Sequence, residues 1–162
     1  SSYDLFISSD LDRCQATMSL LFPQVDPLLF KSFREMNFGD FEGKTYEELK
    51  GLEDYQKWLE DWKRYSPPNG EFFEQFTNRI ENGWNQLVGL IEKAGAKAPF
   101  IVTHGGVIRC LLSKMASEKK DFWEWDVPHG TGYELIFTLQ QLRRRERCIS
   151  LRAVPLMEKE NG

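Results

Sequence analysis

The sequence predicts an α/β fold of three layers, in which helices cover both faces of a mostly parallel sheet that carries an antiparallel edge strand. One observation is that short apolar runs alternate along the chain with amphipathic segments, an alternation typical of α/β proteins. Another is that Phe100 to Val102 are all apolar, as in a strand buried on both faces. With 162 residues, 41% of them hydrophobic, the chain can build one sizeable core, so we expect a single domain over residues 1–162.

The first part of the chain predicts two strands, a helix and a long loop. Leu5 to Ile7 form an apolar run that ends at Ser8-Ser9-Asp10, which indicates a strand, a turn and the start of a helix over about 10–21. A second short strand is expected at 28–30. Residues 31–44 contain two glycines and show no regular period, so we expect them to form a loop.

The central segment predicts helices. Thr45 followed by Glu48 is a capping-box pair, which indicates that a helix begins there. Four aromatic residues recur at steps of three, four and three, as on one face of a helix over about 53–65: Tyr55, Trp58, Trp62 and Tyr65. The sequence SPPNG ends that helix. Apolar residues then recur at helical spacing over about 73–93, which predicts a long amphipathic helix.

The last part predicts a strand at 100–103, a helix from 105 or 106 to 117, and a closing pair of strands at 132–139 and 147–154. A basic run, Arg143 to Arg147 with one glutamate inside it, lies between the two closing strands. A solvated hairpin end explains this run better than a patch that binds a phosphate backbone.

Composition excludes several classes of protein. A net charge of −4 with 28% charged residues argues against a nucleic-acid binder with a broad basic face. Cys14, Cys110 and Cys148 are far apart and form no C-x-x-C pair, so we expect free thiols in a reducing compartment rather than disulfides or a zinc site. No apolar stretch approaches the roughly 18 residues of a membrane span. We therefore expect a soluble, cytoplasmic protein with no nucleic-acid or membrane partner.

His104 stands at the point where the strand at 100–103 runs into two glycines and a helix. The amides and the positive dipole end of a helix N-terminus favour an anion beyond the strand. Gly105 and Gly106 let the backbone approach a bound group closely. The alternative is a capped helix with an incidental histidine.

Two further segments carry polar residues that need an explanation. Arg13 lies in the first turn of the helix at 10–21, where a cation opposes the helix dipole. An anion shared with the helix amides would explain its position, and so would an ordinary surface ion pair with Asp10 or Asp12. Glu35 lies among aromatic residues in the loop 31–44, where desolvation raises a carboxyl pKa toward the range of a general acid. Its alternative is a salt bridge with Arg34 or a lysine.

Together and in this order, the three segments resemble motifs of the histidine phosphatase superfamily, whose fold is called phosphoglycerate mutase-like. SSDLDRCQAT, residues 8–17, is similar to its S-x-L-x-R-x-x-x-T segment. FREMNFGDFEG, residues 33–43, is similar to its L-x-E-x-x-x-G-x-x-E-G segment, with Phe33 in the leucine position. VTHGGVIR, residues 102–109, resembles its second-histidine motif. Within the superfamily the likeness is strongest to the α-ribazole phosphatases of cobalamin synthesis, through REMNFGDFEG and the W-x-x-x-W helix that leads into PPNGE.

This resemblance implies hydrolysis of a phosphate monoester in two steps. The histidine of an N-terminal Arg-His-Gly motif attacks phosphorus, and water then hydrolyses the phosphohistidine. By the same resemblance, Arg13 is the second phosphate-binding arginine, His104 is the second histidine, which stabilises the transition state, and Glu35 is the acid/base. The chemistry requires no metal and no other cofactor.

The resemblance also implies contacts with the substrate. Gly105 would offer a helix amide to the phosphate, and Glu71 matches a Gly-Glu-Ser motif in which Phe72 replaces the serine. The aromatic stripe that contains Trp58 and Trp62 belongs to a helical, lid-like insert at about 45–70. It either packs the insert against the body or stacks on an organic phosphate. His129 either lines the mouth of the pocket or is an ordinary loop histidine.

No Arg-His-Gly occurs in the 162 residues. In the family this motif lies on a first central strand that is followed by a helix, and a βαβ unit takes roughly 30 residues. We therefore expect the sequence to lack that strand, that helix and the nucleophile, and a chain truncated in this way to be inactive.

Three functions remain open. The preferred one is hydrolysis of α-ribazole 5′-phosphate to α-ribazole and phosphate, and the first alternative is a phosphatase of broad sugar or organic phosphate specificity. The second is a non-catalytic phosphate-binding relative, against which Glu35 argues because an acid/base has no task in a pure binder. A phosphoglycerate mutase is disfavoured because such enzymes carry a longer insert and tail. The expected partner is a small phosphate monoester, and a homodimer is left open.

Overall fold

Three parallel strands form the central sheet in the computed structural model, which describes residues 2–156. They are β1 (Leu5–Ser9), β2 (Leu28–Phe30) and β3 (Pro99–Val102), in the order β2-β1-β3. Ser8 is paired with Val102, so the carboxyl ends of β1 and β3 lie side by side. All three strands lie where the apolar runs predict them.

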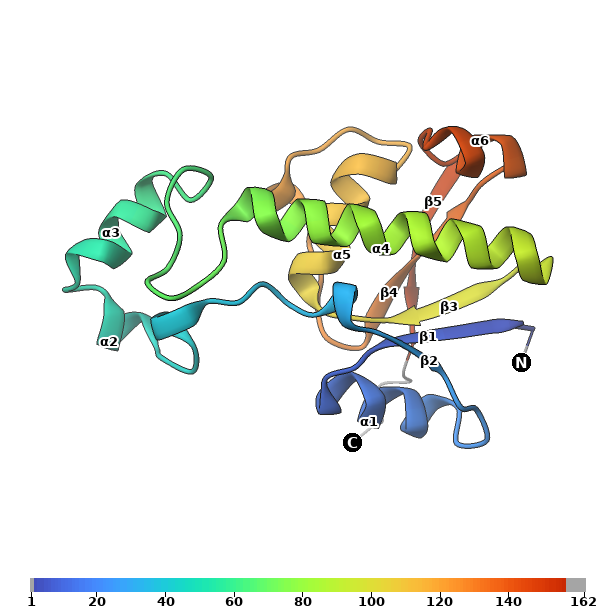
Figure 1. Cartoon of the computed structure of the whole chain (residues 1–162), viewed down its shortest axis with the longest axis horizontal. Coiled ribbons are helices and arrows are strands. Elements are labelled where there is room, and N and C mark those ends of the chain that lie inside the picture. Colours follow the sequence, from blue (N-terminus) through green and yellow to red (C-terminus); the bar gives the residue numbers. More distant parts are fainter. Residues whose placement is uncertain (1, 157–162) are drawn as a thin grey trace.

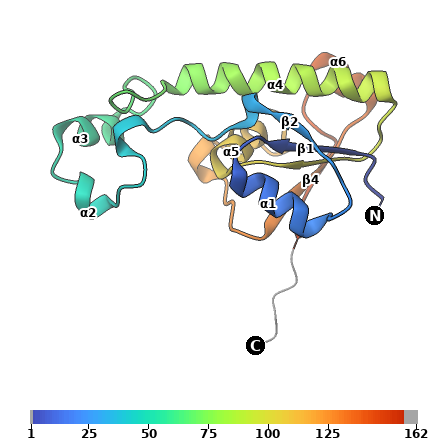
Figure 2. The same ribbon diagram turned by 60° about the horizontal axis from the view of Figure 1, so that its bottom comes forward.

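Helices cover both faces of this sheet, as Figures 1 and 2 show. On one face, α1 (Asp12–Leu21) packs Cys14 and Met18 against Phe100 and Val102. On the other face lie the long helix α4 (Phe73–Ala94) and α5 (Gly105–Met115). Their apolar faces form the main core with the sheet and the first loop, around Ile7, Phe33, Phe76, Ile80 and Val107. The three-layer prediction is confirmed.

The loop 31–44 is irregular apart from two short 3₁₀ turns, Lys31–Phe33 and Gly39–Phe41. Phe33 is fully buried in the main core and anchors the loop to it. The hydroxyl of Thr103 donates a hydrogen bond to the carbonyl of Phe33 (2.7 Å). The loop is therefore tied to the start of α5 at the point where Glu35 follows.

Residues 45–70, called the lid segment below, extend to one side of the body (Figures 1 and 2). The segment holds α2 (Tyr46–Leu49) and α3 (Glu53–Glu60). Thr45 caps α2 as predicted, because its hydroxyl accepts a hydrogen bond from the Glu48 amide (3.3 Å). The prediction of one helical face over 53–65 is wrong, since α3 ends at Glu60 and leaves Trp62 in the following turn.

The closing pair of strands forms its own antiparallel sheet of β4 (Thr131–Ile136) and β5 (Ser150–Pro155). This pair is separate from the parallel sheet, instead of adding an edge strand to it. A helix that the sequence pattern did not indicate, α6 (Leu139–Arg144), joins the two strands. Thr138 and Gln141 form a capping box at its start. Arg143 and Arg144, the first two residues of the basic run, lie in its last turn, where cations complement the helix dipole.

Three further features bear on function. Cys14, Cys110 and Cys148 are buried free thiols. In residues 2–156, no three His, Cys, Asp or Glu side chains gather where they could hold a metal ion. None of the helices in this described part is long and apolar enough to cross a membrane.

Candidate active site

The candidate site forms where β1 and β3 end. Ser9 is the last residue of β1, and His104, two residues after the end of β3, is the N-cap residue of α5. Because the two strands are parallel and paired, their carboxyl ends bring these side chains together, as at the ligand-binding edge of open α/β sheets. Both side chains are buried, with 0% of Ser9 and 6% of His104 exposed.

The hydrogen bonds of His104 determine which ring nitrogen carries the proton. Arg13 Nε lies 3.3 Å from His104 Nδ1. Since a guanidinium can only donate, Nδ1 accepts this bond, and the proton of the neutral ring is on Nε2. Nε2 then donates to Ser9 Oγ at 2.8 Å. The interpretation of His104 as incidental does not account for Arg13, a residue 91 positions away in sequence that bonds to its ring.

Electrostatics keep His104 neutral. Desolvation by burial, followed by the positive charges of Arg13 and Arg79, lowers the pKa of His104 from 6.5 to about 4. The Sγ of Cys14 lies 3.4 Å from Nε2, but burial raises the pKa of the Cys14 thiol. A thiolate–imidazolium pair is disfavoured at both members, so this contact does not make Cys14 a nucleophile of the cysteine-protease type.

The Glu35 carboxylate is hydrogen-bonded to the first turn of α5. Its Oε2 accepts a hydrogen bond from the Gly106 amide (3.0 Å), and its Oε1 accepts one from the Met36 amide (3.0 Å). A Cβ on Gly106 would lie 2.2 Å from Glu35 Oε1, so only glycine admits the carboxylate at this distance. The second glycine of the Thr-His-Gly-Gly sequence therefore serves Glu35.

Arg34 and Glu35 have different partners, although they are neighbours. Arg34 forms a two-pronged pair with Asp10, with both N–O distances at 2.7 Å. This arginine is the main reason why the pKa of Asp10 is lowered. The alternative in which Glu35 merely forms a salt bridge with Arg34 is therefore wrong, because Arg34 binds Asp10 and Glu35 binds backbone amides.

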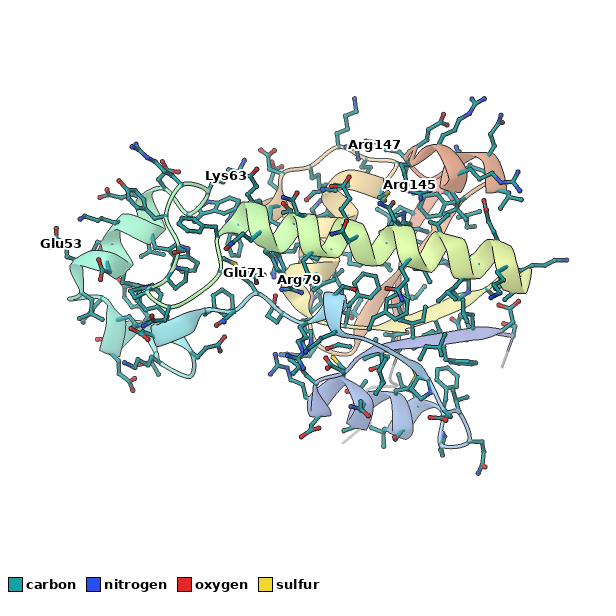
Figure 3. All side chains as sticks on the ribbon, in the orientation of Figure 1. Glu53, Lys63, Glu71, Arg79, Arg145 and Arg147 are labelled. Atoms are coloured by element: carbon teal, nitrogen blue, oxygen red, sulfur yellow. The ribbon has the colours of Figure 1, made fainter. Side chains whose placement is uncertain are left out.

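Glu71 is engaged by an arginine that the sequence did not single out. Both oxygens of Glu71 accept hydrogen bonds from Arg79 at 2.9 Å, and Oε1 also accepts one from the Asn37 amide (3.1 Å). Figure 3 shows Glu71 and Arg79 close together beside the first turns of α4. The carboxylate that the resemblance assigns to the substrate is thus occupied within the protein.

A cleft of about 170 Å³ connects Glu35 to the lid segment. Glu35, Gly106 and Arg109 supply its polar lining, and Trp58 and Trp62 come from the lid segment. The other lining residues are apolar or aromatic: Met36, Phe38, Phe73, Phe76, Phe122 and Trp123. The structure therefore brings the predicted acid/base and the two predicted lid tryptophans into one cavity.

Arg109 and Trp123 are cleft residues that the sequence reasoning missed. The Arg109 guanidinium lies 5.6 Å from the ring centre of Trp123, and its Nε donates to the Trp125 carbonyl (3.1 Å). A signal for Arg109 was available, because it follows Gly105 by four positions on α5 and so lies on the same helix face. No local pattern marks Trp123, since it joins the cleft from a separate 3₁₀ turn, Phe122–Glu124.

The remaining predicted residues lie at different distances from this cluster. Gly105 begins α5 beside His104, and a Cβ built on it would meet only Arg109 Nη1, at 3.3 Å. His129 is exposed in the loop before β4 and is not among the residues that line the cleft. Arg13 is exposed apart from its bond to His104, so its guanidinium is available to an anion.

The arrangement can hold an anion and transfer a proton. The α5 N-terminus and the exposed guanidinium of Arg13 offer donors of the kind that a phosphoryl group requires. The Nε2–H of His104 donates to Ser9 Oγ and would serve a phosphoryl oxygen only in exchange for that bond. Glu35 lies in the loop 31–44, where its carboxylate binds the Gly106 amide in the first turn of α5 and lines an aromatic cleft that can hold an organic group. The geometry favours phosphate-ester chemistry with Glu35 as the group that moves protons.

Comparisons with known proteins agree with this geometry. The family description "Histidine phosphatase superfamily (branch 1)" matches residues 1–146. The chain is 30% identical over 134 residues to the adenosylcobalamin/alpha-ribazole phosphatase of Escherichia coli (strain K12), in an alignment that covers 80% of this chain and 64% of that protein. The chain thus spans less than two thirds of this curated relative's length.

Solved structures give the same result. The alpha-ribazole phosphatase from Shigella flexneri superposes with a TM-score of 0.73 at 29% identity, over 85% of this chain and 69% of that one. A phosphoglycerate mutase from Bacillus anthracis superposes with a TM-score of 0.58 at 23% identity, over 71% of this chain and 60% of that one. The latter likeness concerns the fold alone and confirms the phosphoglycerate mutase-like architecture.

Proposed function

Because the chain belongs to the histidine phosphatase superfamily, we propose that it provides the phosphate-holding and proton-transfer residues of a phosphomonoesterase that works through a phosphohistidine. The observation that carries the proposal is the position of Glu35. Its carboxylate accepts a hydrogen bond from the Gly106 amide and lines an aromatic cleft. That amide is two residues beyond His104, so the proton-transfer group and the anion-holding groups share one helix N-terminus.

In the proposed reaction, Arg13, His104 and the Gly105 amide hold the phosphoryl oxygens and neutralise the charge that develops on them. A histidine nitrogen attacks phosphorus, the P–O bond to the alcohol breaks, and Glu35 gives its proton to the departing oxygen. Glu35 then takes a proton from water, whose oxygen attacks the phosphohistidine. This second step releases inorganic phosphate and restores both groups.

The attacking histidine is the part of the proposal that these 162 residues do not supply. No Arg-His-Gly occurs among them, His129 is exposed, and His104 is engaged by Arg13 and Ser9. We assign the attack to the histidine of an Arg-His-Gly motif of the kind that the resemblance to the family implies.

We propose a phosphate monoester with a planar, nucleoside-like group as substrate, and α-ribazole 5′-phosphate as the first choice. The aromatic lining of the cleft supports this choice, because stacking surfaces suit a flat base better than a polyhydroxylated sugar. The runner-up is a broad-specificity phosphatase for sugar or organic phosphates. The three free thiols support a cytoplasmic location.

The test is phosphate release by the full-length gene product from α-ribazole 5′-phosphate and from a sugar phosphate. We expect the first to be hydrolysed with the higher kcat/KM. Glu35→Gln keeps the size of the side chain and should lower kcat/KM by about 100-fold or more, the usual range for loss of an acid/base.

The alternatives predict different results. A phosphoglycerate mutase would yield an isomerised ester instead of free phosphate. A non-catalytic phosphate-binding relative would release no phosphate while folded, and its affinity for inorganic phosphate would be the same in the wild type and in the Glu35→Gln variant. Either result would overturn the proposal.

A further inference from the structure

We propose that Arg79 is a positioning residue that holds Glu35 in place for proton transfer, and that Glu71 is the anchor of Arg79 rather than a ligand of the substrate. The inference rests on the proposed function, because it concerns the acid/base of the same reaction. Arg79 lies on α4 near the cleft and forms more hydrogen bonds than the other arginines there. The proposal explains what these bonds do.

Arg79 forms five hydrogen bonds within the protein. Its Nη1 donates to the carbonyls of Ser32 and Arg34, both at 2.8 Å, and its Nη2 donates to the carbonyl of Glu35 at 3.3 Å. Its Nε and Nη2 also donate to the two oxygens of Glu71 at 2.9 Å. One guanidinium therefore bonds the backbone on the N-terminal side of Glu35, including Glu35 itself.

Glu71 fixes the other side of the same loop. Its carboxylate accepts a hydrogen bond from the Asn37 amide (3.1 Å), and its own amide donates to the Asn37 carbonyl (2.8 Å). Residues 34–37 are thus held at both ends by the Arg79–Glu71 pair. Glu35 lies between these ends and points its carboxylate at Gly106.

Burial and geometry explain why this pair is suited to positioning. The side chains are only 25% and 16% exposed, so the pair is less screened than a surface salt bridge. The planar guanidinium meets carbonyls with one edge and a carboxylate with the other. Lysine carries the same charge but has no fork to span both groups. Arg79→Lys therefore changes geometry while it conserves charge.

The leaving group provides a readout that a merely structural role would not change. An alkyl phosphate leaves as a strongly basic alkoxide and needs a proton in the transition state, whereas p-nitrophenyl phosphate leaves as a weakly basic phenolate that does not. The value of kcat/KM reports on the steps up to formation of the phosphoenzyme. A displaced Glu35 therefore slows the alkyl ester selectively, while partial unfolding slows both esters equally.

The experiment measures kcat/KM for an alkyl phosphate and for p-nitrophenyl phosphate with the full-length gene product. The variants are Glu35→Gln, Arg79→Lys, Glu71→Gln and the double variant of Glu35→Gln with Arg79→Lys. Arg143→Lys is the matched control, because Arg143 also pairs with α4, through Glu92 at 2.7 Å, but lies on the exposed surface.

We expect Arg79→Lys to lower kcat/KM for the alkyl ester by about tenfold or more and for p-nitrophenyl phosphate by less than about threefold. Glu71→Gln should show the same selectivity with a smaller loss, and it serves as the test if Arg79→Lys does not fold. In the Glu35→Gln background, Arg79→Lys should cost almost nothing further, because two residues that act through one group are not additive. Arg143→Lys should behave as the wild type.

Equal losses for the two esters, or full additivity with Glu35→Gln, would overturn the positioning role of Arg79. A failure of the proposed function would give different results. In that case the wild type would release no phosphate, or Glu35→Gln would itself leave the alkyl ester unaffected.

Discussion

His104 shows how strongly a residue's chemistry depends on its immediate surroundings. A histidine at a helix N-terminus could be charged or neutral, and the difference decides whether it attracts an anion by charge or by one N–H. Here burial and Arg13 lower its pKa to about 4, and Arg13 assigns the proton to Nε2. His104 is therefore a neutral donor at physiological pH in the unliganded protein.

The lowered pKa predicts a loss of stability in acid. His104 titrates near a pKa of 6.5 in the unfolded chain and near 4 in the folded one, so the unfolded state binds more protons between these values. The free energy of unfolding should be undiminished above pH 6.5 and should fall as the pH drops toward 4, by up to about 3 kcal/mol. Urea unfolding at a series of pH values measures this change in the free energy of unfolding.

Two histidine variants make this prediction specific. His104→Gln should lessen the pH dependence between pH 6.5 and 4, because this titrating group is gone and only carboxyls with a lowered pKa, such as Asp10, still contribute. His129→Gln, which removes the exposed histidine, should retain the wild-type dependence. The same slope in both variants would show that another group is responsible.

Among the elements, α4 contributes much of the main core and is bonded to the loop that contains Glu35. Its apolar residues Phe76, Ile80 and Leu87 are almost fully buried, and Arg79 lies on the same helix next to them. The helix approaches the first loop so closely at Gly83 that a Cβ there would lie 2.4 Å from Ser32 Oγ and 2.8 Å from Phe33 Cε1. A Cβ on Gly89 of the same helix would meet nothing within 4 Å.

These two glycines of α4 predict opposite effects of the same substitution. Gly89→Ala should raise the free energy of unfolding by about 1 kcal/mol, the helix propensity of alanine over glycine. Gly83→Ala should lower it, because overpacking against Phe33 costs about 1–3 kcal/mol and outweighs the propensity gain. Chemical denaturation of both variants measures the difference, and stabilisation by both would contradict the close approach of α4 to the loop.

In the molecule as a whole, aromatic contacts join the lid segment to the body. Trp58 packs against Phe38 and Phe41 with ring centres about 6 Å apart. Trp62 lies 4.5 Å from Phe73 at the start of α4 and 5.7 Å from Trp123. The lid segment thus contacts the body at the walls of the cleft, so that its position and the shape of the cleft depend on the same residues.

A lid that stacks on the substrate predicts a change in KM that depends on substrate size. Trp62→Leu should raise KM for α-ribazole 5′-phosphate by about tenfold, since stacking on an aromatic contributes about 1–3 kcal/mol per base. KM for a small aryl phosphate should not change. Steady-state kinetics on both substrates measures this, with Tyr65→Leu as the control, because Tyr65 is 40% exposed and lines no part of the cleft. Equal losses for both substrates would indicate that Trp62 only packs the core.

Local patterns in the sequence were sufficient to predict the strands, the main helices and the candidate residues His104, Arg13 and Glu35. These features depend on local signals: apolar runs, helical spacing, caps and glycines that stand next to the residues they serve. The three-layer arrangement followed from their alternation. Three short segments likewise predicted that the chain belongs to the histidine phosphatase superfamily.

The partners of these residues, by contrast, follow only from the way the chain folds in space. Arg79 meets Glu71 and the carbonyls 45 to 47 positions before it, and Trp123 reaches the cleft from a separate turn. The end of α3 at Glu60 divides the aromatic stripe, and the closing strands pair with each other apart from the parallel sheet. Hydrogen bonds and ring contacts between distant segments leave no local pattern, because their energy depends on the packing of the whole chain. The same packing makes His104 neutral and keeps Glu71 occupied.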